Sequence, residues 1–319
     1  MTPAVSVQPV VLIAGSANLD FVVRARHIPA PGETVLGRDF ETFPGGKGAN
    51  QAVACARAGG ATTHMLLGLG DDAYAATLEQ SLRSADVALH IVRAQDQPTG
   101  TAFICVSDDA ENAITVAPGA NQALRPAHWP SLAGVSHLLL QLETPLDSVT
   151  AYARAAHAQG SKVILNAAPA QPLPAELIDL LDVLIVNQGE LAVLAGGQGS
   201  IAQQIQRLSV PCVIVTLGEH GCMAFSDGVP RFQTTFTVAA VDTTGAGDTF
   251  CGAFTAALSH QSSLSDALRF ASAAAALACT KMGAQTSIPQ RREVDAFLAQ
   301  QPPVDSNRQS VLRALCGFL

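Results

Sequence analysis

The sequence predicts an α/β fold in three layers, with a mainly parallel central sheet between two layers of helices and a small β-sheet lid beside it. The first observation is a series of short, continuously apolar runs, which are typical of strands buried on both faces. These runs lie at 11–15, 64–70, 137–143, 162–169, 183–187 and 212–218. The second observation is that helical stretches such as "NQAVACARAG" and "PLDSVTAYARAAHAQG" alternate with the runs. The third is a composition of 48% hydrophobic and 14% charged residues over 319 positions, which fits a large buried core.

Two segments break this alternation. Residues 20–43 and 98–118 contain shorter, alternating strands separated by turn residues, a pattern typical of antiparallel hairpins. We therefore predict a discontinuous lid from these two segments, and the exposed edges of its strands favour a homodimer in which two lids pair. The remaining segments are predicted to form one large domain, from 1–19, 44–97 and 119–301. The tail, 302–319, begins at a helix-stopping Pro-Pro and continues as a short amphipathic stretch to which the sequence assigns no role.

Charge and cysteine usage exclude several classes of protein. A net charge of −8 without a block of basic residues argues against nucleic acid or an anionic membrane as the main partner. The apolar run near the N-terminus is too short for a signal core, and the most apolar helix is too short to span a bilayer. Seven scattered cysteines without a C-x-x-C pair indicate reduced thiols and a cytoplasmic location. The dinucleotide fingerprint, the serine-hydrolase elbow and the H-E-x-x-H zinc motif are all missing.

The stretch "DTTGAGD", 242–248, lies between "VAAV", which is predicted to be a strand, and a predicted helix. Gly245, Ala246 and Gly247 would leave their backbone N–H groups open to an anion, and the helix N-terminus adds a favourable field. Asp248 falls in the first helical turn, where an isolated aspartate can act as a cap. The flanking glycines favour instead an anion hole for a transferring phosphoryl group, with Asp248 accepting the proton of the attacking hydroxyl.

A second glycine cluster is "PGGKGANQ", 44–51. It is not a Walker A loop, because Lys47 is followed by Gly48 and not by Ser or Thr. Its glycines permit a tight turn into a helix, from which Lys47 and Asn50 would direct hydrogen-bond donors at a ligand. Taken alone, the stretch is equally consistent with a hairpin turn and a solvated lysine.

Taken together, the two glycine clusters indicate a resemblance to a known family. The chain resembles the ribokinase-like, or PfkB-type, carbohydrate kinases, whose "GGxGxN" and "DTxGAGD" signatures both occur here in the expected order. The resemblance runs from about residue 11 to about residue 300 and includes "GSANLD", "APGAN", "QLET", "NAAPA", "TLGEHG" and "KMGAQTSIP". It implies the ribokinase-like fold and ATP-dependent phosphorylation of D-ribose at O5, with Asp248 as base and the amides of Gly245, Ala246 and Gly247 as anion hole.

The resemblance also places the sugar contacts. They are expected at Asn18, Asp20, Gly46, Lys47, Asn50, Glu143 and Asp248. A short carboxylate such as Asp20 can accept two neighbouring O–H groups at once. Considered without the family, Asp20 could be a turn residue and Glu143 a solvated loop acid.

The nucleotide and cation sites follow from the same likeness. ATP contacts are expected at Asn187, Thr216, Gly218, Gly221, Gly247 and Ser272. Glu190 is expected to orient Mg²⁺ through water, although alone it could be an ordinary acid in a first helical turn. A K⁺ site is expected at Asp242, Thr244, Ala278, Lys281, Gly283 and Ser287, largely through backbone oxygens. Ser272 departs from the family, which usually carries a larger polar residue near the adenine.

Other functions remain open at this point. The same chemistry could act on deoxyribose, another small sugar or a nucleoside, and Asp20 favours a substrate with adjacent hydroxyls. Phe21, Phe40, Phe43 and Phe103 could form a platform for a nucleobase or simply the apolar core of the lid. A non-catalytic sugar sensor is disfavoured because the base, the glycines and the N-x-x-E element are intact.

Overall fold

The computed structural model describes residues 9–109, 111–302 and 306–318. In that part of the chain nine strands form one sheet, in the order β13-β12-β11-β10-β9-β8-β1-β4-β5. Their bounds are β1 Val10–Ala14, β4 Thr62–Gly70, β5 Ala88–Ala94, β8 Val135–Leu140, β9 Lys162–Asn166, β10 Val183–Asn187, β11 Cys212–Thr216, β12 Gly221–Ser226 and β13 Val229–Thr234. The strands from β5 to β11 pair in parallel, and only β12 and β13 are antiparallel additions at one edge. The mainly parallel sheet is confirmed, and each of the six apolar runs overlaps one of its strands.

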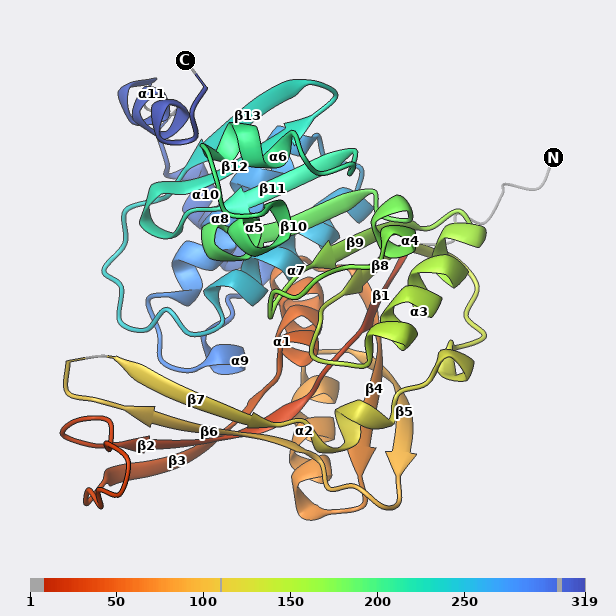
Figure 1. Ribbon diagram of the computed structural model, residues 1–319, viewed down its shortest axis with the longest axis vertical. Helices are drawn as coiled ribbons and strands as arrows, with labels where there is room; N and C mark the ends of the chain where they lie inside the picture. The colour runs from red at the N-terminus through yellow and green to blue at the C-terminus, as the bar shows by residue number, and fades with distance from the viewer. Residues whose placement is uncertain (1–8, 110, 303–305, 319) are drawn as a thin grey trace.

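Helices cover both faces of this sheet (Figure 1). One face packs against α1 Lys47–Val53, its π-helical continuation Ala54–Ala58, α2 Ala73–Ser84, α7 Ala246–Ser259, α8 Leu264–Ala278 and α10 Arg291–Ala299. The other face packs against α3 Leu146–Ala158, α4 Ala175–Asp179, α5 Gln188–Ala195, α6 Ile201–Ile205 and α11 Ser306–Leu315. Within β1, Val11 and Ile13 belong to the first core while Leu12 and Ala14 belong to the second, which explains why the strand is apolar throughout. No helix in these three ranges is long and apolar enough to cross a membrane.

The smaller sheet has four strands in the order β3-β2-β6-β7. Their bounds are β2 Asn18–Arg24, β3 Arg38–Gly45, β6 Gly100–Val106 and β7 Asn112–Ala117. The two hairpins β2–β3 and β6–β7 are antiparallel as predicted, but β2 and β6 pair in parallel at the centre. The reason is that both strands leave the large domain at the same place, where Asn18 is paired with Gly100. Figure 1 shows the four strands side by side, projecting from the body of the molecule.

The prediction of a strand at "VAAV" is wrong. Residues 235–245 have no regular structure, and Val241 is 61% exposed, so this segment runs over the surface. Its backbone is hydrogen-bonded to a residue distant in the sequence, because the N–H groups of Val241 and Asp242 both donate to the carbonyl of Cys279. The "DTTGAGD" turn therefore follows a loop, and α7 begins directly after it.

The described part of the tail, residues 306–318, is part of the folded body. Helix α11 lies against the edge strand β13 (Figure 1), and its Leu312 is buried in the second core. The backbone N–H of Ala202 donates to the carbonyl of Cys316, and the ring of Phe318 meets that of Phe232 edge-on, with their centroids 5.7 Å apart. The tail therefore covers an edge that would otherwise expose unpaired backbone groups.

Candidate active site

The carboxylate of Asp248 is held by helix α1. Gly245 is the N-cap of α7 with φ 73°, and Asp248 lies in the first turn, where the sequence placed it. Its Oδ2 accepts a hydrogen bond from Asn50 Nδ2 and its Oδ1 one from Gln51 Nε2, both at 2.9 Å. Asp248 therefore directs both oxygens across to α1 instead of capping its own helix. This arrangement argues against the interpretation of Asp248 as a simple cap.

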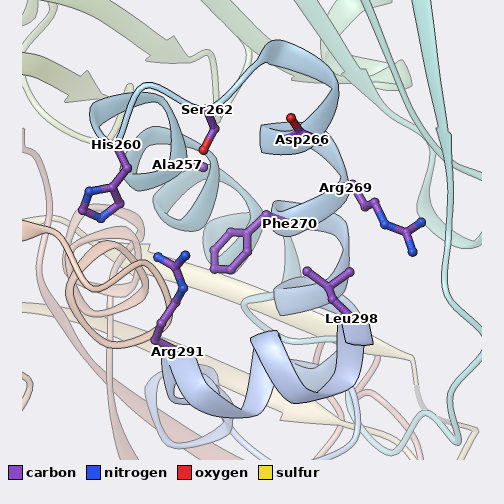
Figure 2. A pocket seen from close by; sticks show the side chains of 8 residues that line it. All are labelled: Ala257, His260, Ser262, Asp266, Arg269, Phe270, Arg291 and Leu298. Atoms are coloured by element: carbon purple, nitrogen blue, oxygen red, sulfur yellow. The ribbon is translucent and has the colours of Figure 1, made fainter. Parts of the chain in front are cut away.

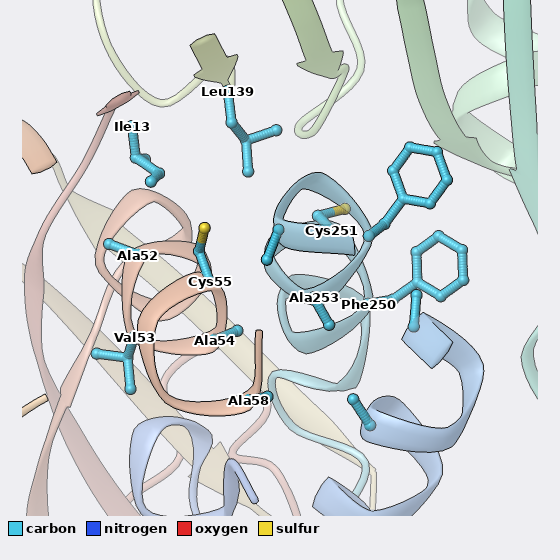
Figure 3. Close-up of a cluster of buried hydrophobic side chains, with 14 of the residues drawn as sticks. Ile13, Ala52, Val53, Ala54, Cys55, Ala58, Leu139, Phe250, Cys251 and Ala253 are labelled. Carbon is cyan, nitrogen blue, oxygen red and sulfur yellow. The ribbon is translucent and has the colours of Figure 1, made fainter. Parts of the chain in front are cut away.

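Small residues allow the two helices to approach closely. A Cβ on Gly252 would lie 2.3 Å from the backbone oxygen of Gln51, and one on Gly59 would lie 2.1 Å from the Cβ of Ala256. Figure 3 shows the short side chains that line this contact, among them Ala54 and Ala253. The close packing of α1 on α7 brings the "GGKGAN" and "GAGD" stretches together, although about 200 residues separate them in the chain.

Glu143 is tied to the glycine-rich turn. Its Oε2 accepts a hydrogen bond from Ser16 Oγ at 2.5 Å and another from the backbone N–H of Lys47 at 3.2 Å. Ser16 Oγ in turn accepts from the backbone N–H of Gly48 at 3.3 Å. Glu143 is thus not a solvated loop acid, and the turn around Lys47 is not a free hairpin. Ser16 was not predicted from the sequence.

Asp20 and Asn18 lie at the root of β2, against the same turn. A Cβ on Gly45 would fall 2.0 Å from Asp20 Oδ2, and Gly46, with φ 87°, leaves no room for a Cβ beside the backbone nitrogen of Asn18. Asn18 Oδ1 accepts a hydrogen bond from Asn121 Nδ2 at 2.8 Å. Neither oxygen of Asp20 accepts a hydrogen bond within the described ranges, although the side chain is largely buried. Its lone pairs are therefore available to a ligand.

Three carboxylates, those of Asp248, Glu143 and Glu190, act on the ammonium group of Lys47, and Asp20 lies near two of them. Burial, followed by the nearby charges of Glu143 and Asp248, raises the pKa of Asp20 to about 7. Burial would lower the pKa of Lys47, but the charges of Asp248, Glu143 and Glu190 outweigh it, and the net shift is upward. The site is therefore rich in acceptors and has a single strong cation, which suits a ligand that brings many hydroxyl groups.

Asn187 and Glu190 lie at the start of α5 and cap it reciprocally. The backbone N–H of Glu190 donates to Asn187 Oδ1, and that of Asn187 donates to Glu190 Oε2, both at 2.8 Å. The ordinary helix-capping role is therefore present. It leaves Glu190 Oε1 for another partner, and burial raises the pKa of this carboxyl.

The other predicted nucleotide residues lie around the end of β11. Thr216 is its last residue, and Gly218 (φ 56°) and Gly221 (φ 110°) form the turn into β12. Gly221 is required by this turn, because a Cβ there would lie 2.1 Å from the carbonyl oxygen of Gln233. Ser272 is buried on α8, where its Oγ lies 3.6 Å from the sulfur of Cys222.

The loop around Asp242 is rigidly held. Asp242 Oδ1 accepts from the backbone N–H of Thr244 and Oδ2 from that of Gly283, both at 2.9 Å. Burial would raise the pKa of Asp242, but these hydrogen bonds outweigh it and the pKa is lowered. The remaining members of the predicted K⁺ site follow directly along the chain, at Ala278 and Lys281 before Gly283 and at the buried Ser287 after it. Within the described ranges, no group of three or more His, Cys, Asp or Glu side chains has a metal-binding arrangement.

The predicted anion hole differs from expectation at Ala246. Its backbone N–H donates to the carbonyl of Thr243 at 3.2 Å, which closes the tight turn before α7. The N–H of Gly247 has no partner in the described part of the chain, and a Cβ at Gly247 would meet no atom within 4 Å. The open approach to the helix N-terminus is therefore at Gly247.

Comparison with known proteins decides the family. A model of the pfkB family carbohydrate kinases matches residues 9–291. The chain belongs to the pfkB family. It is 39% identical over 298 residues to the ribokinase of Haemophilus influenzae, a match that covers 90% of this chain and 97% of that protein. Its fold is similar to that of Thermotoga maritima ribokinase, with a TM-score of 0.84 and 37% identity over 92% of this chain and 100% of that one. It is also similar to Arabidopsis thaliana ribokinase complexed with ribose and ATP, with a TM-score of 0.83 and 33% identity over 92% and 100% of the two chains.

As a pfkB-family enzyme, the protein is a carbohydrate kinase, which transfers a phosphoryl group from a nucleotide to an alcohol group of its substrate. Sequence motifs located the charged residues of its site but missed the buried polar residues behind them. These are Ser16, Gln51, Asn121, Gln141 and Asn166. One signal was available, because Gln141 directly follows the apolar end of β8 and Asn166 is the last residue of β9.

A separate cavity of about 290 Å³ lies at the opposite end of α7 (Figure 2). It is lined by Ala257, His260, Ser262, Asp266, Arg269, Phe270, Arg291 and Leu298. His260 is twelve residues beyond Asp248, which corresponds to about 18 Å at 1.5 Å per helical residue. This cavity therefore lies outside the cluster of carboxylates around Lys47.

Proposed function

We propose that this pfkB kinase transfers the γ-phosphoryl group of ATP to O5 of D-ribose, giving D-ribose 5-phosphate and ADP. The observation that carries the proposal is the convergence of Asp20, Glu143 and Asp248, expressed in the pKa of about 7 at Asp20. Buried carboxylates with free lone pairs suit a ligand that donates several O–H groups. The similar proteins named as ribokinases, one of them complexed with ribose and ATP, support the choice of sugar.

In the proposed reaction the sugar O5–H donates to the carboxylate of Asp248. As O5 attacks, the O5–P bond forms, the bond between the γ-phosphorus and the β,γ-bridging oxygen breaks, and the proton passes to Asp248. The N–H of Gly247 and the field at the N-terminus of α7 stabilise the charge on the transferring group. Positioning and electrostatics supply most of the catalysis in this class of reaction, so one base and one anion site suffice.

Two cations complete the proposal. Glu190 Oε1 would hold Mg²⁺ through water, and the oxygens of a hard, hydrated cation site fit a carboxylate in this position. The loop held by Asp242, with Thr244, Ala278, Lys281, Gly283 and Ser287, would hold K⁺ mainly through backbone oxygens. The cations supply positive charge beside the phosphates, and the chain's own residues position the sugar and move its proton.

The alternatives are other hydroxyl-bearing substrates, namely deoxyribose, another small sugar or a nucleoside. Phe21 is stacked with Phe40 and Phe103, with ring centroids 6.1 and 5.4 Å apart, and it also meets Tyr74 edge-on. Because Phe40 and Phe103 are 64% and 54% exposed, these rings form an apolar cluster at the surface of the lid and not a buried core. A coupled assay of ADP release across a panel of sugars and nucleosides, run once with K⁺ and once with Na⁺, separates these substrates and tests the monovalent cation.

The base is tested by Asp248→Asn. This variant keeps the shape of the side chain but cannot take the proton, so turnover is expected to fall by about two orders of magnitude or more, while ribose and ATP still bind in isothermal titration calorimetry. Turnover near that of the wild type would remove Asp248 from the role of base.

We also propose that two lids pair in a homodimer. On the face of the lid sheet opposite Phe103, Ile114 and Val116 are 54% and 42% exposed, which is unusual for large apolar side chains that lie together. A second copy of the same sheet would cover them and the strand edges. Size-exclusion chromatography with light scattering at micromolar concentration should report a dimer, and a monomer there would contradict the proposal.

A further inference from the structure

A chain of buried amide side chains runs behind Asp248 and is not accounted for by sugar or nucleotide binding. Gln141 Nε2 donates to Gln51 Oε1 at 2.6 Å, and Gln51 Nε2 donates both to Asp248 Oδ1 at 2.9 Å and to Asn166 Oδ1 at 3.0 Å. Gln51 and Gln141 are completely buried, and Asn166 is 8% exposed. The four residues come from α1, the end of β8, the end of β9 and α7.

The orientation of these amides is fixed from the backbone. The carbonyl oxygen of Ile185 can only accept, so the Asn166 group that meets it at 3.2 Å must be Nδ2. Asn166 therefore directs its Oδ1 toward Gln51, and the Gln51 group that donates to this oxygen must be Nε2. The same nitrogen reaches Asp248, so Gln51 presents a donor and not its carbonyl to the carboxylate. Gln141 occupies the remaining oxygen of Gln51.

Burying this network is costly. Each amide removed from water must recover its hydrogen bonds, and Gln141 Oε1 has no partner in the described part of the chain. Gly15 approaches that oxygen so closely that a Cβ there would lie 1.9 Å from it. An apolar core at this place would avoid the cost. The one charged group that the network reaches is the carboxylate of Asp248.

We propose that Gln51 is a positioning residue for Asp248, and that Gln141 and Asn166 hold Gln51 in its donating orientation. The inference rests on the proposed role of Asp248 as the base. Gln51 fixes Oδ1 from the buried side and prevents rotation of the carboxylate. Oδ2 then remains on the side of Asn50, whose Nδ2 donates to it at 2.9 Å.

Gln51→Met tests this inference, because methionine has a similar length and shape but donates no hydrogen bond. We expect kcat to fall about 10- to 100-fold while the Kd for ribose changes less than about threefold, since orientation of the base governs turnover and not sugar binding. We also expect the acid limb of the kcat/KM pH profile to move to higher pH, because a donor to an anionic carboxylate is lost. Gln141→Met should show the same changes to a smaller degree.

Gln51→Glu gives a test with the opposite pH dependence. Above neutral pH its carboxylate faces that of Asp248 and activity should be lost, whereas at lower pH the protonated carboxyl can donate and activity relative to Gln51→Met should rise. The other ionisable groups of the site are the same in the wild type and in every variant, so the comparison isolates position 51. A merely structural role would not produce this reversal.

Gln204→Met is the matched control, since Gln204 is another buried glutamine whose Nε2 donates to the carbonyl of Gly199 away from the site. It should retain wild-type kcat. The inference is overturned if Gln51→Met keeps kcat within about twofold, or if its kcat falls with an unchanged pH profile and no recovery in Gln51→Glu at low pH. If Gln51→Met does not fold, the inference is tested by measuring kcat and the pH profile of Gln141→Met and Gln51→Glu instead. Full turnover in Asp248→Asn would instead refute the proposed base, which keeps the two failures distinguishable.

Discussion

The charge of Asp20 is predicted to reduce the stability of the folded chain, and Asp20→Asn should reveal by how much. The pKa of this carboxyl rises from 3.8 to about 7 on folding, so between these values the folded form retains a proton that the unfolded chain has released. Stability therefore falls as pH rises through this window. The asparagine variant lacks this loss, and since neither oxygen of Asp20 accepts a hydrogen bond in the described ranges, no native contact is removed.

The magnitude follows from the two pKa values. Proton linkage gives the variant an advantage of about 2 kcal/mol at pH 5 and about 4 kcal/mol at pH 8. Urea unfolding of both proteins at the two pH values measures this difference directly. The same substitution should weaken ribose binding, because a charged acceptor of hydroxyl groups is lost. An advantage that does not grow between pH 5 and pH 8 would refute the electrostatic argument at this position.

Three further predictions follow from packing. Gly247→Ala should fold normally, since its Cβ meets no atom, but should lower kcat about tenfold or more by obstructing the approach of the phosphoryl group; unchanged kinetics would contradict the anion site. Gly252→Ala should lose both stability and kcat, because its Cβ would lie 2.3 Å from the Gln51 backbone and force α1 from α7; a wild-type melting temperature would argue against this contact. Leu312→Ala should cost about 2–5 kcal/mol in urea unfolding with kcat unchanged, and a change in kcat instead would indicate that the tail acts on the site.

The sequence predicted most of the fold because buried parallel strands leave an unmistakable apolar pattern. It failed at "VAAV", where four apolar residues resemble a short strand but follow the surface, held by hydrogen bonds to Cys279 that come from distant sequence. The parallel pairing of β2 with β6 was also missed, because the direction of neighbouring strands depends on where each leaves the large domain.

The site was predicted only as far as its motifs extend. Residues such as Asp248 and Lys47 lie in glycine-rich stretches whose composition points to phosphate chemistry. Gln51 lies one residue beyond the "GGKGAN" signature, and its contacts with Gln141 and Asp248 span 90 and 197 positions of the chain. No local pattern encodes such pairings, since they arise from the packing of α1 on α7. The cytoplasmic location inferred from the cysteines stays a prediction.

The placement of Asn18 and Asp20 on the first residues of β2 has a consequence for how substrate preference and closure are related. The same strand that contributes these polar groups continues outward to the exposed end of the smaller sheet, and Gly100 of β6 abuts Asn18 so tightly that a methyl group would collide with its amide oxygen. A tilt of the outer strands should therefore be transmitted to the groups that we propose as sugar contacts. Substitutions at the outer end of the lid should then change the Michaelis constant although they do not contact the substrate. The orientation of the lid would therefore influence substrate affinity as much as the residues that line the site.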